Sequence, residues 1–192
     1  MSGPAFRQIV CKIHSRCNLA CDYCYVYEAA DQNWRNQPKA VAARTVQAAG
    51  RRIAEHAAAH DLQGVTVTLH GGEPLLVGLD GLRQIVTELR CAVEGVTDLA
   101  IGLQTNGVLL DETLAEYLLA EGIRVGISLD GGRAANDRHR RFAHGGGSHD
   151  HVVRAVRLMT RPEIMDVTKM PAISGTICRP AAVGDAPRTI CR

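Results

Sequence analysis

Three cysteines lie close together near the start of the chain, at Cys17, Cys21 and Cys24. They follow an apolar stretch, residues 6–13, so one short loop after a predicted strand carries all three thiols. Thiolates are strong ligands for soft metals, and three of them in one loop can chelate a metal centre. The spacing therefore predicts a site built on thiolate chemistry.

Three kinds of site are compatible with this spacing. A structural zinc ion normally takes four protein ligands, and the fourth would have to come from His14 or from a distant cysteine. A disulfide beside one free thiol needs an oxidising compartment, but the N-terminus shows no secretory pattern, and we expect a cytoplasmic protein. A 4Fe-4S cluster held by three cysteines leaves one iron open to a substrate or cofactor, and we favour this interpretation.

The composition is ordinary for one globular domain. The chain has 192 residues, of which 46% are hydrophobic and 22% are charged, and its formal net charge is +2. Without a long basic run there is no electrostatic signature of nucleic-acid binding. No apolar segment approaches the ~18 residues of a membrane span. We therefore expect neither nucleic acid nor membrane among the partners.

Short β-branched stretches alternate with longer helical patterns, as is typical of βαβ units that build a parallel sheet. The predicted fold class is α/β. Strands are expected at residues 6–13, 65–69, 99–104 and 123–129, and helices at 40–60, 79–93, 112–121 and 149–160. The polar, glycine-rich stretch 131–148 is expected to lead into the last helix. Prolines interrupt the pattern after residue 161, so we expect a core over 1–161 and a weakly structured tail over 162–192, with one doubtful strand at 172–178.

Polar motifs follow each of the four predicted strands. The cysteine loop follows the first, His-Gly-Gly-Glu-Pro at 70–74 the second, Thr-Asn-Gly at 105–107 the third, and Ser-Leu-Asp-Gly at 128–131 ends the fourth. The C-terminal ends of parallel strands lie on one side of the sheet, where α/β folds place their ligand sites. The four motifs are therefore predicted to converge.

Some of these residues also have simpler interpretations. Gly71 and Gly72 can form a flexible turn, although they would also let the backbone approach a ligand while Glu73 accepts from an ammonium group. Asn106 and its following glycine form a common turn pair. The residues with less specific signals are Ser128 and Asp130, which can be ordinary strand-end polar groups, and Arg138, Arg140 and Arg141, which can form a solvated basic loop.

Two further groups of metal-binding residue types are not favoured as sites. Four histidines fall within 139–151, but the three glycines between them would have to be ordered at an entropic cost. Cys11 and Cys91 are isolated, and an isolated cysteine is most often a small buried hydrophobic residue.

Together these motifs resemble the radical S-adenosylmethionine (radical SAM) superfamily. Its hallmark, Cys-x3-Cys-x-aromatic-Cys, is matched by Cys17, Cys21, Tyr23 and Cys24. The motifs after the second, third and fourth strands look like the branch that modifies peptides and proteins, which includes anaerobic sulfatase-maturating enzymes and SPASM-type peptide maturases. The resemblance runs from about residue 7 to residue 159.

The resemblance implies a 4Fe-4S cluster on the three cysteines, with its fourth iron chelated by the amino and carboxylate groups of S-adenosylmethionine. It also implies a set of cofactor-binding residues: Tyr23 near the adenine, Gly71, Gly72 and Glu73 at the methionine ammonium, Ser128 and Arg140 at the ribose and carboxylate, and Asn106. The implied reaction is reductive cleavage of S-adenosylmethionine and hydrogen abstraction from a peptide or protein substrate. A reductant such as flavodoxin or ferredoxin would supply the electron.

Two departures from the family pattern shape the expected fold. Family barrels usually have six βα units, whereas about four are predicted here, so we expect a partial (βα) radical SAM barrel. The branch commonly carries a cysteine-rich C-terminal extension, and this chain offers only Cys178 and Cys191 in that region. From these two departures we expect a truncated or frame-disrupted product. The alternative hypothesis is a catalytically inactive remnant that binds iron-sulfur or zinc.

Overall fold

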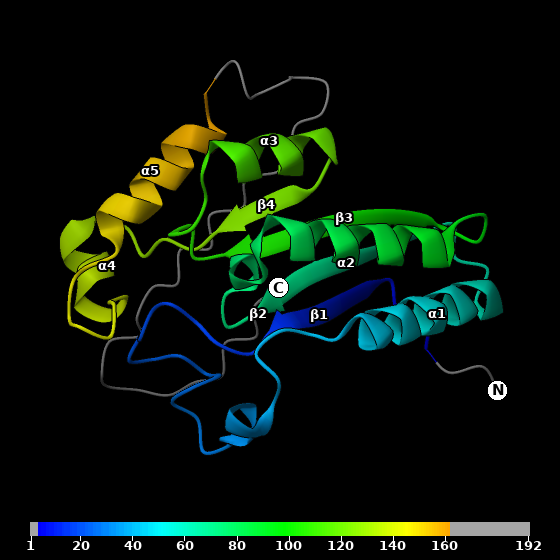
Figure 1. Ribbon diagram of the computed structural model, residues 1–192, viewed down its shortest axis with the longest axis horizontal. Coiled ribbons are helices and arrows are strands. Elements are labelled where there is room, and N and C mark those ends of the chain that lie inside the picture. Colours follow the sequence, from blue (N-terminus) through cyan, green and yellow to red (C-terminus); the bar gives the residue numbers. More distant parts are fainter. Residues whose placement is uncertain (1–3, 162–192) are drawn as a thin grey trace.

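The computed structural model describes residues 4–161, which form a parallel sheet with its helices packed alongside. Figure 1 shows their arrangement. The strands are β1 (Gln8–His14), β2 (Gly64–Gly71), β3 (Asp98–Thr105) and β4 (Arg124–Ile127). The α-helices are α1 (Ala43–Ala59), α2 (Gly78–Val93), α3 (Glu112–Ala120), α4 (Arg133–His139) and α5 (His149–Met159), and two short 3-10 helices are η1 (Asn33–Asn36) and η2 (Pro74–Val77).

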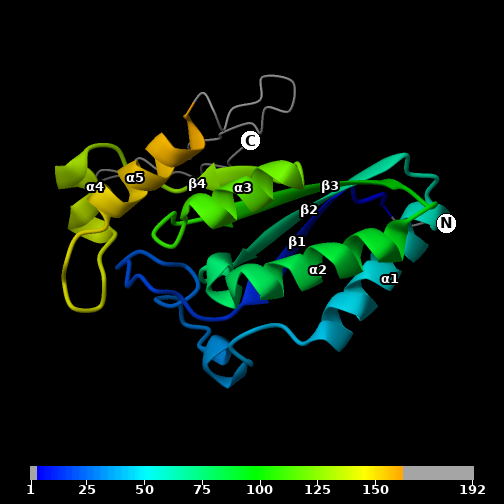
Figure 2. The same ribbon diagram turned by 45° about the horizontal axis from the view of Figure 1, so that its top comes forward.

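The sheet has the order β1-β2-β3-β4, and every neighbouring pair is parallel. All four strands therefore run in the same direction, and the loops that follow their C-terminal ends lie on one side of the sheet. The pairing of β1 with β2 contains an irregularity between Lys12 and His14, just before the cysteine loop begins. Figures 1 and 2 show α1, α2 and α3 along one face of the sheet.

The hydrophobic core lies between the sheet and this helical layer. Along β2, Val65, Val67 and Leu69 are buried while the residues between them are only half buried, as alternation in a strand requires. Helices α1 and α2 approach closely at Gly50, where an added Cβ would lie 2.6 Å from Cβ of Ala92. The helices thus cover the apolar face of the sheet, and the polar motifs collect at its C-terminal rim.

The structure confirms the predicted α/β class and the four parallel strands, with boundaries shifted by one to a few residues. It differs over 131–148, where α4 forms inside the stretch expected to be a connection. That helix has no apolar stripe, since its one buried residue is Asn136, and hydrophobic periodicity could not reveal it. The doubtful strand at 172–178 and the expected tail lie outside the described residues.

The expectation for Cys91 was wrong. Cys91 is exposed on α2, because the buried stripe of that helix runs through Leu82, Ile85, Val86, Leu89 and Val93 and leaves position 91 on the other face. Cys11 is half buried, and burial raises the pKa of its thiol. A separate observation concerns membranes: within residues 4–161 we find no helix with both the length and the apolar character needed to span a bilayer.

Candidate functional site

A cavity of about 180 Å³ opens at the C-terminal rim of the sheet, and its wall draws on the segments that follow all four strands. It brings together every residue expected at the site except Glu73. The expected residues in the wall are Cys17, Cys21, Tyr23, Cys24, Gly71, Gly72, Asn106, Ser128 and Arg140, and the others include Leu19, Tyr25, Val26, His70, Gln104 and Thr105. Motifs that are far apart in the sequence thus face one open cavity.

The three thiols of the cysteine loop, residues 17–24, are half buried around this cavity. Burial raises the pKa of Cys21 to about 11; Arg140 opposes this rise, and negative charge on Cys17 or Cys24 adds to it. Burial also raises the pKa of Cys17. Because all three cysteines line one cavity, the loop presents three soft sulfur ligands to it.

The described residues contain no group of three or more His, Cys, Asp or Glu side chains close enough to hold one metal ion. This holds for the histidines of 139–151 as well as for the cysteine loop. Thiolates of a four-iron cluster each bind a different iron atom, so such a cluster does not require its ligands to meet at one point. The chemistry of the donor set therefore fits an iron-sulfur cluster.

Gly71 and Gly72 pack against the start of the cysteine loop. The Gly72 amide donates to the carbonyl of His14 at 2.9 Å, which continues the β1–β2 pairing beyond its irregularity. An added Cβ would lie 2.2 Å from the His14 carbonyl oxygen at Gly71, and 2.4 Å from the Arg16 carbonyl oxygen at Gly72. These contacts with the protein's own backbone already require glycine at both positions. The sequence had suggested a flexible turn or the approach of a ligand as the reason.

Glu73 lies outside the cavity wall, in contrast to the expected contact with an ammonium group. Its side chain is fully buried, and its carboxylate accepts from the Leu75 amide at 3.0 Å, the Thr105 hydroxyl at 2.6 Å and the Asn106 amide at 2.8 Å. Burial raises its pKa, and the three donors oppose that rise. Glu73 therefore joins the end of β2 to the end of β3 and acts in this structure as an internal brace.

Asn106 connects the end of β3 to the cysteine loop. Its side-chain amide donates to Oδ1 of Asn18 at 2.7 Å and to the sulfur of Cys17 at 3.6 Å, while its own Oδ1 accepts from the Val108 amide at 3.0 Å. Asn106 thus does more than form a turn, because its side chain also contacts two residues of the cysteine loop. The hydrogen bond from the Asn106 side chain to Cys17 lowers the pKa of that thiol, whereas burial raises it.

The other side of the cysteine loop contacts α4 and the residues after it. The Ala20 amide donates to the Arg141 carbonyl at 2.7 Å. Arg140 donates to the hydroxyl of Tyr23 at 3.0 Å, and that hydroxyl donates in turn to Asp130. Burial, and after it the bond to Asp130, raises the pKa of Tyr23 to about 12, so the phenol stays protonated at neutral pH.

Arg140 has one donor without a partner. Among the residues that the structure describes, nothing accepts from its buried Nε. A buried guanidinium donor left unpaired is costly, whereas a planar carboxylate could accept from it. The arrangement therefore suits an anionic group bound in the cavity.

Several contributors could not be identified from sequence. Gln104 donates to the Ser128 hydroxyl at 2.9 Å and lies across Gly126, where an added Cβ would be 2.2 Å from its Oε1. His139 contacts Asp22 at 2.9 Å and docks α4 beside the cysteine loop. Gln104 is a half-buried polar residue between buried residues at the end of β3, and this polar residue in an apolar strand was the one sequence signal for its role.

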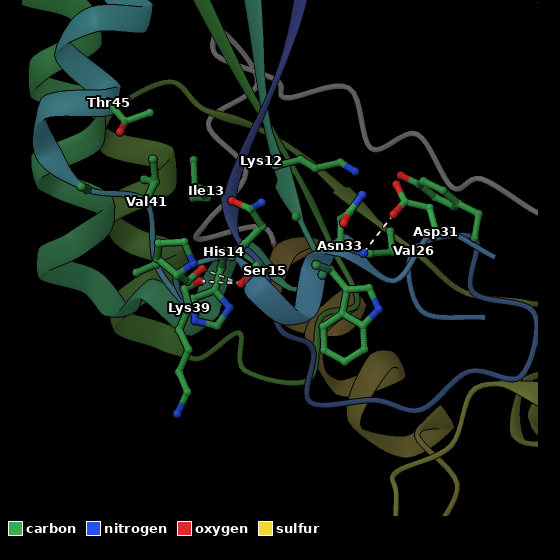
Figure 3. Close-up of a pocket in the computed structure, with 18 of the residues that line it drawn as sticks. Lys12, Ile13, His14, Ser15, Val26, Asp31, Asn33, Lys39, Val41 and Thr45 are labelled. Carbon is green, nitrogen blue, oxygen red and sulfur yellow. Dashed lines mark hydrogen bonds between the residues drawn. The ribbon is translucent and has the colours of Figure 1, made fainter. Parts of the chain in front are cut away.

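A larger cavity of about 660 Å³ adjoins the first, and both include Tyr25, Val26, Gly71 and Gly72 in their walls. Figure 3 shows this larger space between the end of β1, the segment around residues 25–45 and the start of α1, with Lys12 and Asp31 among its labelled side chains. The Asn33 amide donates to the Asp31 carboxylate at 2.9 Å in this wall. Gly71 and Gly72 thus lie between two neighbouring spaces.

Comparison with known proteins identifies the family. The model of the radical SAM superfamily matches residues 11–169, which is most of the chain, and the protein belongs to this superfamily. Members of the family use a 4Fe-4S cluster and S-adenosylmethionine, and these are the two cofactors that the sequence motifs led us to expect. The resemblance drawn from the motifs is therefore confirmed at the level of the family.

The similar curated proteins include sulfatase-maturating enzymes. The chain is 27% identical over 150 residues to the cysteine-type anaerobic sulfatase-maturating enzyme of Clostridium novyi (strain NT), covering 78% of this chain and 39% of that protein. It is 32% identical over 164 residues to the serine-type enzyme of Klebsiella aerogenes, covering 85% and 39%. The chain thus spans about two fifths of the length of these relatives.

Solved structures show the same relationship. The structure of native anSMEcpe with bound AdoMet and Cp18Cys peptide matches with a TM-score of 0.70 and 25% identity, covering 84% of this chain and 41% of that one. Native anSMEcpe with bound AdoMet matches with a TM-score of 0.66 and 27% identity, covering 79% and 40%. The fold of this chain corresponds to part of those larger proteins.

Proposed function

We propose that this chain is a radical SAM core that binds a 4Fe-4S cluster through Cys17, Cys21 and Cys24 and binds S-adenosylmethionine beside it. The observation that carries the proposal is the cavity whose wall holds three half-buried cysteines and Arg140, a cation whose buried Nε has no partner among the described residues. Three thiolates suit the cluster, and the guanidinium suits the methionine carboxylate. A reduced 4Fe-4S cluster held by these cysteines would supply one electron for the reductive cleavage of S-adenosylmethionine, which precedes hydrogen abstraction from the substrate.

The other residues of the cavity act by binding and orientation. Gly71 and Gly72 would leave backbone groups accessible to the methionine ammonium, and Tyr23 would lie near the adenine. Ser128, held by Gln104, offers a hydroxyl to the ribose. Asn106 and Glu73 would act on the cofactor indirectly, since Asn106 contacts the cysteine loop and Glu73 braces β2 against β3.

The proposed substrate is a peptide or protein. Support comes from the similar sulfatase-maturating enzymes and from the solved relative that holds a peptide. A small reductant such as flavodoxin or ferredoxin would donate the electron. The five cysteines of residues 4–161 are all free thiols, which agrees with a reducing, cytoplasmic setting.

Anaerobic reconstitution of the 192-residue chain with iron and sulfide tests the proposal. After dithionite reduction, the sample is assayed for cluster absorbance and for 5′-deoxyadenosine. Cys21→Ala should lose the cluster, whereas Cys91→Ala, which removes an exposed thiol outside the site, should retain it. Equal iron content in the two variants would refute the assignment of ligands. Cluster absorbance without 5′-deoxyadenosine would instead favour a protein that binds the cluster but does not turn over.

A further inference from the structure

Tyr27 contacts the last residue of the cysteine loop and the segment just before its first residue. Its backbone amide donates to the carbonyl of Cys24 at 3.1 Å, at the end of the loop. Its hydroxyl donates to the carbonyl of Ser15 at 3.2 Å, two residues before Cys17. The segment between these contacts contains neither helix nor strand, so tertiary hydrogen bonds have to hold it.

The ring of Tyr27 is itself fixed by its surroundings. It meets the ring of Trp34 edge to face, with centroids 4.7 Å apart and an interplanar angle of 86°. The side-chain amide of Gln32 donates to the Tyr27 carbonyl at 2.8 Å. Two aromatic rings in this arrangement stabilise each other, and the orientation of the Tyr27 hydroxyl is therefore restrained.

Gly72 provides the surface against which the Tyr27 hydroxyl rests. An added Cβ at Gly72 would lie 1.8 Å from Oη of Tyr27 and 2.4 Å from the Arg16 carbonyl oxygen, far inside van der Waals contact. In addition, the Glu73 amide donates to that same Arg16 carbonyl at 2.9 Å. The rim of β2, the Tyr27 side chain and the start of the cysteine loop are thus in direct mutual contact.

We infer that Tyr27 is a positioning residue: it closes the cysteine loop against Gly72 and so holds Cys17 and Cys24 in place before any iron arrives. What the loop holds rests on the proposed function, whereas the closure itself does not. A loop that is ordered in advance loses less conformational entropy when its thiolates take up a cluster. Tyr27 has no atom in the wall of the thiol cavity, so its effect passes through the loop.

The variants separate the hydroxyl from the ring. Tyr27→Phe removes the bond to Ser15 and keeps the contact with Trp34, whereas Tyr27→Leu removes both. Tyr117 on α3 is of the same residue type and lies outside the site, so Tyr117→Phe and Tyr117→Leu are the matched controls. Gly72→Ala and the double variant Gly72→Ala/Tyr27→Phe test the contact between the two residues.

The first measurement uses the protein without iron. Alkylation of Cys17 and Cys24 by iodoacetamide is followed by mass spectrometry, and the thermal midpoint is followed by circular dichroism. Tyr27→Phe should raise both alkylation rates about fivefold, the ratio that loss of one ordinary hydrogen bond produces, and Tyr27→Leu should raise them further. The Tyr117 variants should leave these rates unchanged even where they lower the midpoint. Unchanged rates in Tyr27→Leu would overturn the inference.

The second measurement is iron and sulfide content after reconstitution. Tyr27→Leu should retain less than half of the parental iron, with Tyr27→Phe between the two. The double variant should lose less than the two single losses predict together, because removing the hydroxyl relieves part of the clash that Gly72→Ala introduces. Additive losses would contradict direct contact. If the parent itself took up no cluster, the proposed function would fail, and the alkylation rates would still decide whether Tyr27 closes the loop.

Discussion

The cysteine loop is held on two sides that differ in kind. On the β2 side, backbone amides of Gly72 and Glu73 donate to the segment 14–16, and the supporting carboxylate of Glu73 is fully buried. On the α4 side, most contacts come from side chains, with Arg140 on Tyr23 and His139 on Asp22. The first side is a continuation of the sheet, whereas the second is an attached polar network.

The difference suggests a division of labour. The backbone hydrogen bonds of the β2 side should control the shape of the cysteine loop and therefore the assembly of a cluster. Contacts made by a guanidinium with an unpaired donor should control the affinity for an anionic ligand beside it. Substitutions on the β2 side should consequently affect stability and iron content, and those on the α4 side should affect ligand binding.

The largest effect is expected at Glu73. In the parent protein, three internal donors bind the Glu73 carboxylate. Glu73→Gln replaces one of its oxygens with an NH2 group, which cannot accept, so at least one buried donor loses its partner. The free energy of unfolding should fall by about 1–3 kcal/mol, measured by urea denaturation. Glu55→Gln on the exposed surface of α1 is the control and should change it by less than about 0.5 kcal/mol. An equal loss of unfolding free energy in Glu73→Gln and Glu55→Gln would contradict the role of Glu73 as an internal brace.

On the α4 side, Arg140→Leu should weaken binding of S-adenosylmethionine about tenfold while leaving iron content at the parental level. The expected loss corresponds to the hydrogen bonds that a charged guanidinium makes with a carboxylate. Anaerobic isothermal titration calorimetry on the reconstituted protein measures it. Arg157→Gln, an exposed cation on α5, is the control. Loss of iron together with ligand affinity would erase the distinction between the two sides.

Arg140→Leu should also change the pKa of the Cys21 thiol. Its pKa, about 11, is raised mainly by burial and is held down by the positive charge of Arg140. Removing that charge disfavours the thiolate, so the pKa should rise and the alkylation rate of Cys21 at pH 9 should fall by a few-fold in the iron-free protein. Cys91 in the same samples should react at an unchanged rate. A faster reaction of Cys21 would contradict the sign of this interaction.

The smallest effect is expected where the α4 side meets solvent. Asp22→Asn removes the charge that faces His139, and this pair is partly exposed, with side-chain exposures of 28% for His139 and 61% for Asp22. Exposed pairs contribute about 0–1 kcal/mol, so the free energy of unfolding should hardly change. Iron content should also stay at the parental level. A marked loss of either would mean that this surface pair matters as much as the buried contacts.

Sequence reasoning succeeded where one physical rule acted over many residues. The β-branched residues of β2 and the helical stripe of α2 predicted both elements, and parallel pairing predicted that the motifs after the strands share one rim. The same stripe also had the information to place Cys91 on the exposed face, and the general tendency of cysteines to be buried was the wrong guide there.

The remaining features depend on tertiary contacts that no local pattern contains. The seven residues of α4 have no apolar periodicity, and the helix is held by Asn136, which donates to Ser148 at 3.1 Å and accepts from the Asp130 amide at 3.4 Å. The motif suggested that the Glu73 carboxylate accepts from an ammonium group, and only the fold shows it facing inward to three internal donors. The sequence showed which residues could bind a ligand, but it did not show whether their side chains point into the core or into the cavity.

The most direct test of the central claim is electron paramagnetic resonance of the reconstituted, dithionite-reduced chain, recorded with S-adenosylmethionine labelled with ¹⁵N and ¹⁷O in its amino and carboxylate groups. Three thiolate ligands and one open iron predict a reduced-cluster signal that shifts when the ligand is added and that shows hyperfine coupling to both labels. A cluster signal that neither shifts nor couples to the labels, in a sample where ligand binding is independently measured, would contradict the account.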